Sequence, residues 1–449
     1  MLLLAMLLTS TFSACSDKND EEEEQGGSGG GTPAGTLTSE ETKERLSQIG
    51  KDFLDAIPQS DFDELDQLAN YIRTTYCDRD GQTEAVEDWA EDCFDNLVEA
   101  TLNDKITSYA TYKYTRRIYE LSQFRAHLSY NTTTEKWDVQ KGTNDLQATC
   151  TDQNGQAVLF KLTSSGRTQK VYIGEIEMDK GYDNGQNIYE YDQAYIVVPA
   201  QINITLTRGG KTLVNVEVTT DLSSMTSENF DLSKDAATVT VKTQLAGYDI
   251  QCKRIAASAN TDSGVQAKFS IVKSSKTLLT AEVIGTVNLP AGLVWQEGVD
   301  DDAFEQKLEN FTGKVTVCKL DLLGKLQVTA VCSDARKIFD AFERAEDYKM
   351  NADSVNACAK DANNSFVAQF SYDGANAVQG TMELEAAANE KGTKYYLEPV
   401  VVFSDGSRYN MTDDSYFNEE NFKSFIDLFD ALCDKYEKMV EKYDDDDYK

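Results

Sequence analysis

Histidine, proline and short catalytic motifs are scarce or missing in this sequence. It contains one histidine, His127, and five prolines, and a single imidazole excludes metal sites that need several histidine ligands. No Cys-x-x-Cys, Gly-x-x-x-x-Gly-Lys-Ser/Thr or His-Glu-x-x-His motif occurs, so zinc ribbons, thioredoxins, P-loop nucleotidases and zinc peptidases lack their signatures. The run GGSGGG at 26–31 only looks like a serine nucleophile elbow, because it belongs to a flexible linker. No motif therefore marks a catalytic class, and we expect a protein that is not an enzyme.

Basic residues are also in deficit. The chain has 43 Lys and Arg against 77 Asp and Glu, a net charge of −34. Such a polyanion repels a phosphate backbone, so we expect no nucleic-acid partner. Apolar residues make up 40% of the 449 residues, which excludes intrinsic disorder over the whole length. The length suggests about two or three domains.

The first 14 residues, MLLLAMLLTSTFSA, form an apolar run without a charged residue. The run is shorter than the roughly 20 helical residues that span a bilayer, so a signal-peptide core fits better than a transmembrane helix. The usual basic residues before such a core are missing. Their absence indicates either an unusual signal or a start codon further upstream.

The apolar run ends in Phe12, Ser13 and Ala14, directly before Cys15. Small residues before a cysteine resemble the lipobox of bacterial lipoproteins. The resemblance implies cleavage before Cys15 and a diacylglyceryl group on its thiol, so the membrane is a partner through this anchor and no other cofactor is expected. Each buried acyl CH₂ contributes roughly 0.8 kcal/mol, so several chains make a lasting tether. The alternative is an ordinary secretory signal with an accidental cysteine.

A charged, glycine-rich stretch follows the cysteine. Residues 16–24 read SDKNDEEEE and lead into a Gly-rich run that ends at Gly35, a composition that favours a solvated tether. An acidic cluster close to the lipidated cysteine resembles the surface-export signal of Bacteroidota lipoproteins, in which Lys or Gln precedes Asp or Glu. The corresponding residues are Lys18, Asp20, Glu21, Glu22, Glu23 and Glu24. The resemblance implies an outer-membrane protein on the extracellular face; a solubilising spacer is the alternative.

The remaining chain predicts an α+β fold with an N-terminal helical layer, an extended antiparallel β meander and a C-terminal docking helix. The expected divisions are a signal peptide at 1–14, a lipidated acidic and Gly-rich tether at 15–36, a helical region at 37–122, an antiparallel β region at 123–290 and an α+β region at 291–449.

Local patterns support these divisions. Thr38 and Glu41 have the spacing of a capping box, and three amphipathic helices are expected between 38 and 105. From about 123 the apolar period changes to two, with turn signals at 154–155, 165–166, 209–210 and 274–275. Residues 206–218 and 271–283 align without gaps and predict two similar hairpins.

After Pro290 helices and strands mix. Helices are expected near 301–311 and 334–348, and strands near 313–321, 326–332, 365–373, 377–387 and 394–404. An apolar stripe from about 418 to Val440 predicts the C-terminal helix. The stripe is wide enough for the helix to dock on a sheet.

Eight cysteines remain besides Cys15, and an exported protein can form disulfides. Cys318 and Cys332 flank a turn near Gly324 and Lys325. A two-residue turn would place the two sulfurs on opposite faces of the hairpin, whereas a three-residue loop centred on Lys325 would place them opposite each other. Cys318 and Cys332 are therefore the candidate disulfide.

Other chemistry is less specific. His127 lies in an alternating strand in phase with polar residues, which favours a solvent-facing side chain. Carboxylates are so numerous that no glycosidase pair or calcium loop stands out. Tyrosines near 109–119, with Trp137 and Trp295, could stack on sugars, although core packing is the commoner fate of strand aromatics.

The sequence therefore favours a lipid-anchored surface lipoprotein that is not an enzyme and binds a glycan or protein ligand, or acts within a surface complex. The alternative is a periplasm-facing lipid carrier or envelope-assembly factor with an apolar groove. A second alternative is a carboxylate-dependent hydrolase, which would need two nearby carboxylates with separated pKa values.

Overall fold

A computed structural model describes most of the chain between residues 36 and 410. The described ranges are 36–95, 98–106, 110–231, 234–256, 265–288, 294–295, 312–374, 377–389 and 391–410. The chain divides into two compact units. Unit 1 comprises Met1–Ser60, Ser275–Gly285 and Thr312–Lys449, and unit 2 comprises Asp61–Ser274 and Thr286–Phe311. Both expected domain boundaries, at 122/123 and at 290/291, fall inside unit 2.

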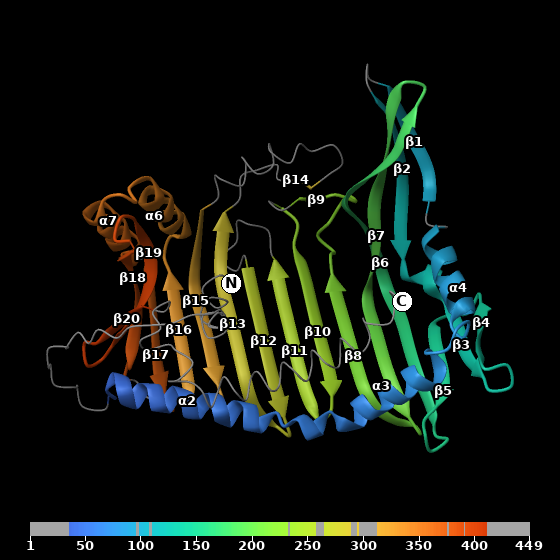
Figure 1. Cartoon of the computed structure of the whole chain (residues 1–449), viewed down its shortest axis with the longest axis horizontal. Coiled ribbons are helices and arrows are strands. Elements are labelled where there is room, and N and C mark those ends of the chain that lie inside the picture. Colours follow the sequence, from blue (N-terminus) through green and yellow to red (C-terminus); the bar gives the residue numbers. More distant parts are fainter. Residues whose placement is uncertain are drawn as a thin grey trace. The chain divides into compact units, whose positions relative to one another are not determined.

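The fold is α+β, with a large mixed sheet in which antiparallel pairs dominate (Figure 1). The helices are α2 (Ser39–Ala56), η1 (Gln59–Asp61), α3 (Asp63–Tyr76), α4 (Glu84–Asp95), η2 (Leu121–Phe124), α6 (Ala335–Asp347) and α7 (Ala352–Asn363). Within the described ranges, no helix is both long and apolar enough to cross a membrane.

The strands of unit 2 come first along the chain. They are β1 (Val98–Ile106), β2 (Ala110–Glu120), β3 (Ala126–Asn131), β4 (Lys136–Lys141), β5 (Leu146–Thr151), β6 (Ala157–Asp183), β7 (Gln186–Arg208), β8 (Lys211–Asp221), β9 (Phe230–Asp231), β10 (Ala237–Leu245), β11 (Tyr248–Ala256), β12 (Val265–Lys273) and β14 (Val294–Trp295). The remaining strands are β13 (Lys276–Asn288), β15 (Thr312–Leu322), β16 (Leu326–Cys332), β17 (Phe366–Tyr372), β18 (Gly380–Ala388), β19 (Tyr395–Phe403) and β20 (Arg408–Asn410).

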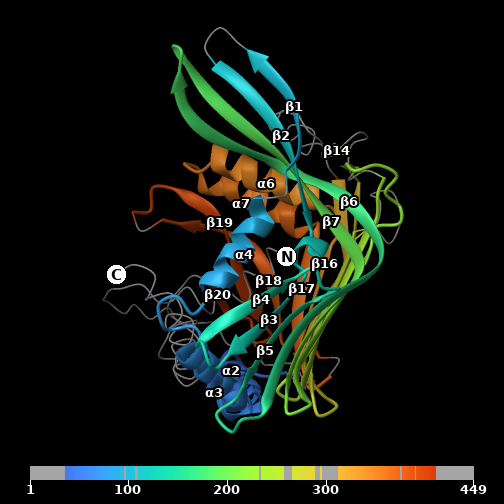
Figure 2. The same cartoon turned by 90° about the vertical axis from the view of Figure 1, so that its right-hand side faces the viewer.

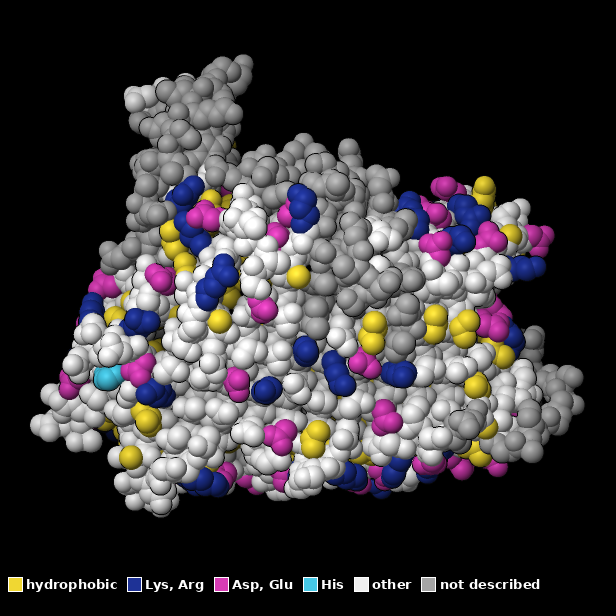
Figure 3. Space-filling model, turned by 180° about the vertical axis from the view of Figure 1, so that it is seen from behind, with side chains coloured by type: hydrophobic (Ala, Val, Ile, Leu, Met, Phe, Trp, Pro, Cys, Tyr) yellow, Lys and Arg dark blue, Asp and Glu magenta, His cyan; other side chains and the backbone are white. Residues whose placement is uncertain are grey.

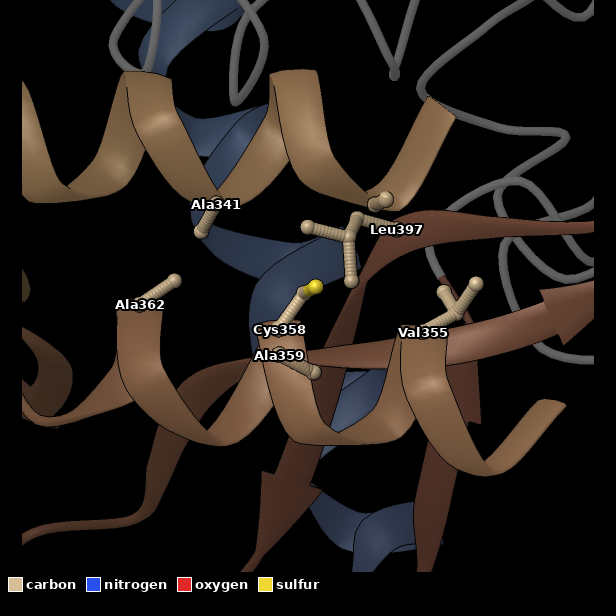
Figure 4. Close-up of a cluster of buried hydrophobic side chains, with 7 residues drawn as sticks. Ala341, Val355, Cys358, Ala359, Ala362 and Leu397 are labelled. Atoms are coloured by element: carbon tan, nitrogen blue, oxygen red, sulfur yellow. The ribbon is translucent and has the colours of Figure 1, made fainter. Parts of the chain in front are cut away.

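Unit 1 contains an antiparallel run in chain order from β15 to β20. Helices α6 and α7 pack against each other beside β18 and β19, around a cluster that includes Ala341, Val355, Cys358 and Leu397 (Figure 4). The expected helix at 334–348 and the five expected strands between 313 and 404 are confirmed to within a few residues. The sequence analysis missed α7, because its buried stripe consists mostly of small residues.

Helix α2 begins with the predicted capping box. The Thr38 hydroxyl accepts a hydrogen bond from Glu41 N at 3.2 Å, and the Glu41 carboxylate accepts one from Thr38 N at 2.8 Å. Within unit 1 the helix lies across the turn ends of β15, β16 and β17 (Figure 1). Asp52 pairs there with Lys325, and Arg45 pairs with Asp373. The predicted N-terminal helical layer is thus present in α2, which caps one end of the strands.

Three expectations for unit 2 are corrected. Residues 98–106 and 110–120, expected to be part of a helical region, form β1 and β2, because a run rich in Thr, Tyr and Ile favours strands. The sheet is also not a pure meander, since β2 pairs with β7 in parallel and β3 pairs with β5 in parallel. The expected turn at 165–166 is a bulge inside the long strand β6, where the register with β7 shifts. By contrast, the hairpin turn at Gly209–Gly210 is confirmed, between Arg208 and its partner Lys211.

Candidate functional site

The sheet of unit 2 is strongly two-faced from β5 to β12. Directly paired residues on neighbouring strands have their side chains on the same face. Leu162 pairs with Ile204, and Ile204 pairs with Val216. Val241 pairs with Val218 on one side and Cys252 on the other. The apolar residues of successive strands are therefore in register across the sheet.

We call the resulting surface the apolar face. Its members are Ala148, Phe160, Leu162, Ile202, Ile204, Leu206, Val214, Val216, Val218, Val239, Val241, Leu245, Tyr248, Ile250, Cys252, Ala267, Phe269 and Ile271. The alternate residues of the same strands form the polar face, which is rich in Thr, Asn, Gln and Lys. Seen from behind, the described surface shows single Lys, Arg, Asp, Glu and hydrophobic side chains scattered among backbone and other side chains (Figure 3).

Helix α3 covers one end of the apolar face. Its residue Leu68 is 1% exposed and packs with Val158 and Leu213, and the half-buried Leu206 and Val214 lie against this cluster. The curved strands rise from the end at which α3 lies (Figure 2). Helix α3 thus closes the turn end of the strands. We call α3, together with the cluster of Leu68, Val158 and Leu213, the floor.

The floor extends to β11 and β12 through residues just before α3. The Phe62 ring stacks on Tyr248 with centroids 5.5 Å apart and planes 7° apart. Asp61 accepts hydrogen bonds from the Tyr248 hydroxyl and from Lys273 Nζ. Burial raises the pKa of Asp61, but these two hydrogen bonds outweigh it and lower the pKa below its usual value. Burial and the Asp61 carboxylate raise the pKa of Tyr248. These ionic and aromatic contacts join the start of α3 to β11 and β12. We call them the Asp61 corner.

Beyond the floor, the apolar face retains partial exposure. Phe269, Ile250 and Val218 are half-buried, Val239 is 36% exposed, and Cys252 is exposed. Within the described residues, Leu68 of α3 packs in the floor cluster, Tyr76 at the end of α3 lies against Tyr130 and Trp137, and α4 packs beside β4. Contiguous apolar surface of this kind marks a site for another molecule more often than isolated apolar residues do.

The predicted anchor residues cannot be compared with the structure. Cys15, the lipobox Phe12 to Ala14 and the acidic segment from Lys18 to Glu24 lie outside the described residues. So do the expected helix near 301–311 and the expected C-terminal helix from about 418.

The candidate disulfide between Cys318 and Cys332 is corrected by the hairpin register. Leu322 pairs with Leu326, so the three-residue loop is centred on Gly324 and Cys318 pairs with Ala330. A register shift then places Cys332 opposite Val315. Both thiols are free, and burial raises the pKa of each.

The aromatic residues considered for sugar stacking belong partly to the core. Trp137 is 8% exposed, donates a hydrogen bond from Nε1 to Tyr76 O at 2.9 Å and lies edge-on to Tyr130. Trp137 and Trp89 also line a groove of about 510 Å³ between α4 and β4, where Lys141 pairs with Asp92 at 2.6 Å. The Trp137 ring thus lines the side of the groove, and its face is not exposed for stacking on a sugar.

His127 has a carboxylate partner at the surface. Its Nε2 lies 2.8 Å from Asp145 Oδ1, and its side chain is 40% exposed. The same carboxylate pairs with Lys161 at 2.9 Å. Hydrogen bonds from Lys161, His127 and Gln147 hold the pKa of Asp145 well below its usual range. This arrangement agrees with the expected solvent-facing histidine. Within the described part of the chain, no group of three or more His, Cys, Asp and Glu residues could hold a metal ion.

No protein-family model, curated protein or solved structure matches this chain. Sequence analysis identified the period-two strands but not the apolar face, and the available signal was the alternation within 202–218 and 237–254.

Proposed function

We propose that the chain is a lipid-anchored cell-envelope lipoprotein with a non-enzymatic binding role, and that the apolar face of unit 2 binds lipid acyl chains. The observation that carries this proposal is the in-register apolar surface from β6 to β12 above the floor formed by α3. It favours the lipid-carrier hypothesis over a glycan ligand.

The chemistry of the face suits hydrocarbon better than sugar. Sugar sites need hydrogen-bonding groups placed around an aromatic surface, whereas aliphatic side chains such as Ile204, Val216 and Ile250 supply non-directional contact. Each acyl CH₂ moved from water onto such a surface contributes about 0.8 kcal/mol when fully buried. Six strands spaced about 4.8 Å apart give a width of about 24 Å, enough for several chains.

The N-terminal segment supports the location. A lipid on Cys15 would hold the protein at a membrane, and residues 16–36 have the acidic, Gly-rich composition expected of a solvated tether. Such a tether lets the folded units move above the lipid surface while they stay attached. An outer-membrane protein on the extracellular face is the location that the acidic segment supports.

Lipid extraction tests the binding role. A soluble chain that begins at Ser16 contains both units, and after purification without detergent its organic extract would be analysed by mass spectrometry. We expect co-purified acyl lipid. Because Val241 lies on the apolar face, Val241→Asn should lower the lipid content at least fivefold. Thr240→Asn changes the neighbouring residue on the polar face and should leave the lipid content unchanged.

Equal lipid content in the two variants, or a wild-type chain without lipid that also fails to take up added fatty acid, would overturn the proposal. Thermal unfolding of both variants checks that they are folded. This comparison separates loss of the apolar surface from a general loss of structure.

Protease digestion of intact cells tests the location. We expect the full-length wild type to be digested and a variant with Glu21, Glu22, Glu23 and Glu24 changed to Ala to be protected, because the acidic export signal is removed. Protection of the wild type while the membrane is intact would exclude surface display. It would place the protein on the periplasmic side, where lipid binding remains possible.

A further inference from the structure

Two cations lie on the apolar face within β10, β11 and β12, and their surroundings differ. They are Lys273, at the end of β12 next to the floor, and Arg254, near the other end of β11. The Lys273 charge is matched by Asp61, which also accepts a hydrogen bond from Tyr248. Lys273 is therefore part of the floor contact.

Arg254 has apolar neighbours. It pairs with Val239 of β10 and Ala267 of β12, and its neighbour along the same face is Cys252. No Asp or Glu of β10, β11 or β12 shares this face, and Arg254 forms no ion pair with any residue in the described ranges. Arg254 is an exposed residue. In a chain with a net charge of −34, a cation left unmatched beside apolar surface is unusual.

We infer that the ligand of the apolar face is an anionic amphiphile whose carboxylate or phosphate headgroup is bound by Arg254. The inference rests on the proposed function and specifies its ligand. A guanidinium group binds such oxygens through two parallel hydrogen bonds, with more geometric specificity than an ammonium group provides.

The length of the face fits an acyl chain running from Arg254 toward the floor. Arg254 and Tyr248 are six residues apart in one strand, a span of about 20 Å. Half of a bilayer's hydrocarbon core is about 15 Å thick, so one acyl chain fits between the guanidinium group and the Tyr248 ring. Cys252 and Ile250 alternate along this path on the same face, and β12 adds Phe269 and Ile271 beside it.

The headgroup assignment predicts a charge-specific loss of affinity. The probes are palmitate and the neutral alcohol with the same carbon chain, titrated separately into the soluble chain below their aggregation concentrations. We expect Arg254→Gln to weaken palmitate binding about tenfold, as when one charge-assisted contact is lost. Alcohol binding should not change.

Lys253→Gln is the matched control. Lys253 is the adjacent residue and pairs with Thr240 on the polar face, so the two substitutions remove the same charge from opposite sides of one strand. We expect palmitate binding to Lys253→Gln to equal that of the wild type. Arg254→Lys keeps the charge without the two-pronged geometry and should retain part of the affinity.

The failures of the two proposals are distinguishable. If palmitate and the alcohol bind equally and Arg254→Gln weakens neither, the headgroup assignment is overturned and the apolar site stands. If Lys253→Gln weakens palmitate as much as Arg254→Gln does, the effect is a diffuse charge effect and the assignment also fails. If neither probe binds the wild type, both the assignment and the proposed function fail.

Discussion

Replacing Leu68 by alanine is expected to lower the free energy of unfolding of unit 2 by about 2–5 kcal/mol. Leu68 is 1% exposed and packs with Val158 and Leu213 between α3 and the sheet. Truncation removes apolar contacts and leaves a cavity that helix and strands cannot fill without moving. The measurement is hydrogen exchange of the β6 and β8 amides, which reports unit 2 even if the two units unfold separately.

Two controls separate cavity formation from a general effect on the helix. Leu65→Ala changes a half-buried residue of the same helix and should have a smaller effect. Leu68→Met nearly conserves the side-chain volume and should change stability by less than about 1.5 kcal/mol. A loss below 1 kcal/mol for Leu68→Ala would mean that α3 does not hold the floor together.

Among the described residues, α3 and the residues just before it hold the turn end of the apolar face. Helix α3 buries the turn end, and the Asp61 corner fixes β11 and β12 to the same floor. The rest of the face keeps partial exposure, which is the condition for binding an apolar ligand. In physical terms, the proposed binding surface is the part of the apolar face that keeps partial exposure beyond α3.

Local signals in the sequence predicted the elements that depend on neighbouring residues. The capping box at Thr38, the turn at Gly209–Gly210 and the five strands expected between 313 and 404 need only short-range patterns, and each was confirmed. The prediction of a helix over residues 98–105 was wrong because the apolar spacing of α4 was continued past its end at Asp95.

Long-range pairing could not be predicted in the same way. The parallel pair of β2 and β7 joins Thr111 to Ile188, and no local pattern encodes such a partner. The disulfide prediction also depended on strand register. Centring the loop on Gly324 instead of Lys325 moves the partner of Cys318 from Cys332 to Ala330. A change of one residue in a turn is enough to alter every pair beyond it.

The site needed the register of several strands at once. Alternation shows that Val241 and Arg254 each lie on one face of their own strand, but only the register shows that the two faces are the same. Lys273 forms an ion pair with Asp61, whereas Arg254 does not, and Asp61 is distant in sequence from both. Sequence analysis had no means of pairing these charges.

Replacing Asp61 by asparagine is the second large change. Asp61 joins the start of α3 to Lys273 and Tyr248, and hydrogen bonds to a charged group contribute about 1.5–3 kcal/mol each. We expect Asp61→Asn to lower the free energy of unfolding of unit 2 by about 2–3 kcal/mol at pH 7. A cycle with Lys273→Gln and the double variant isolates the part due to this pair.

The difference between wild type and Asp61→Asn should depend on pH in a fixed direction. The folded-state pKa of Asp61 is lowered, so the carboxylate stabilises the folded state fully above its unfolded pKa of about 3.9. As the pH falls through the lower folded-state pKa, Asp61 becomes protonated in both states and the advantage is lost. A difference that stays constant from pH 7 down to the acid transition would contradict the ionic role. It would mean that Asp61 holds the corner by shape and neutral hydrogen bonds.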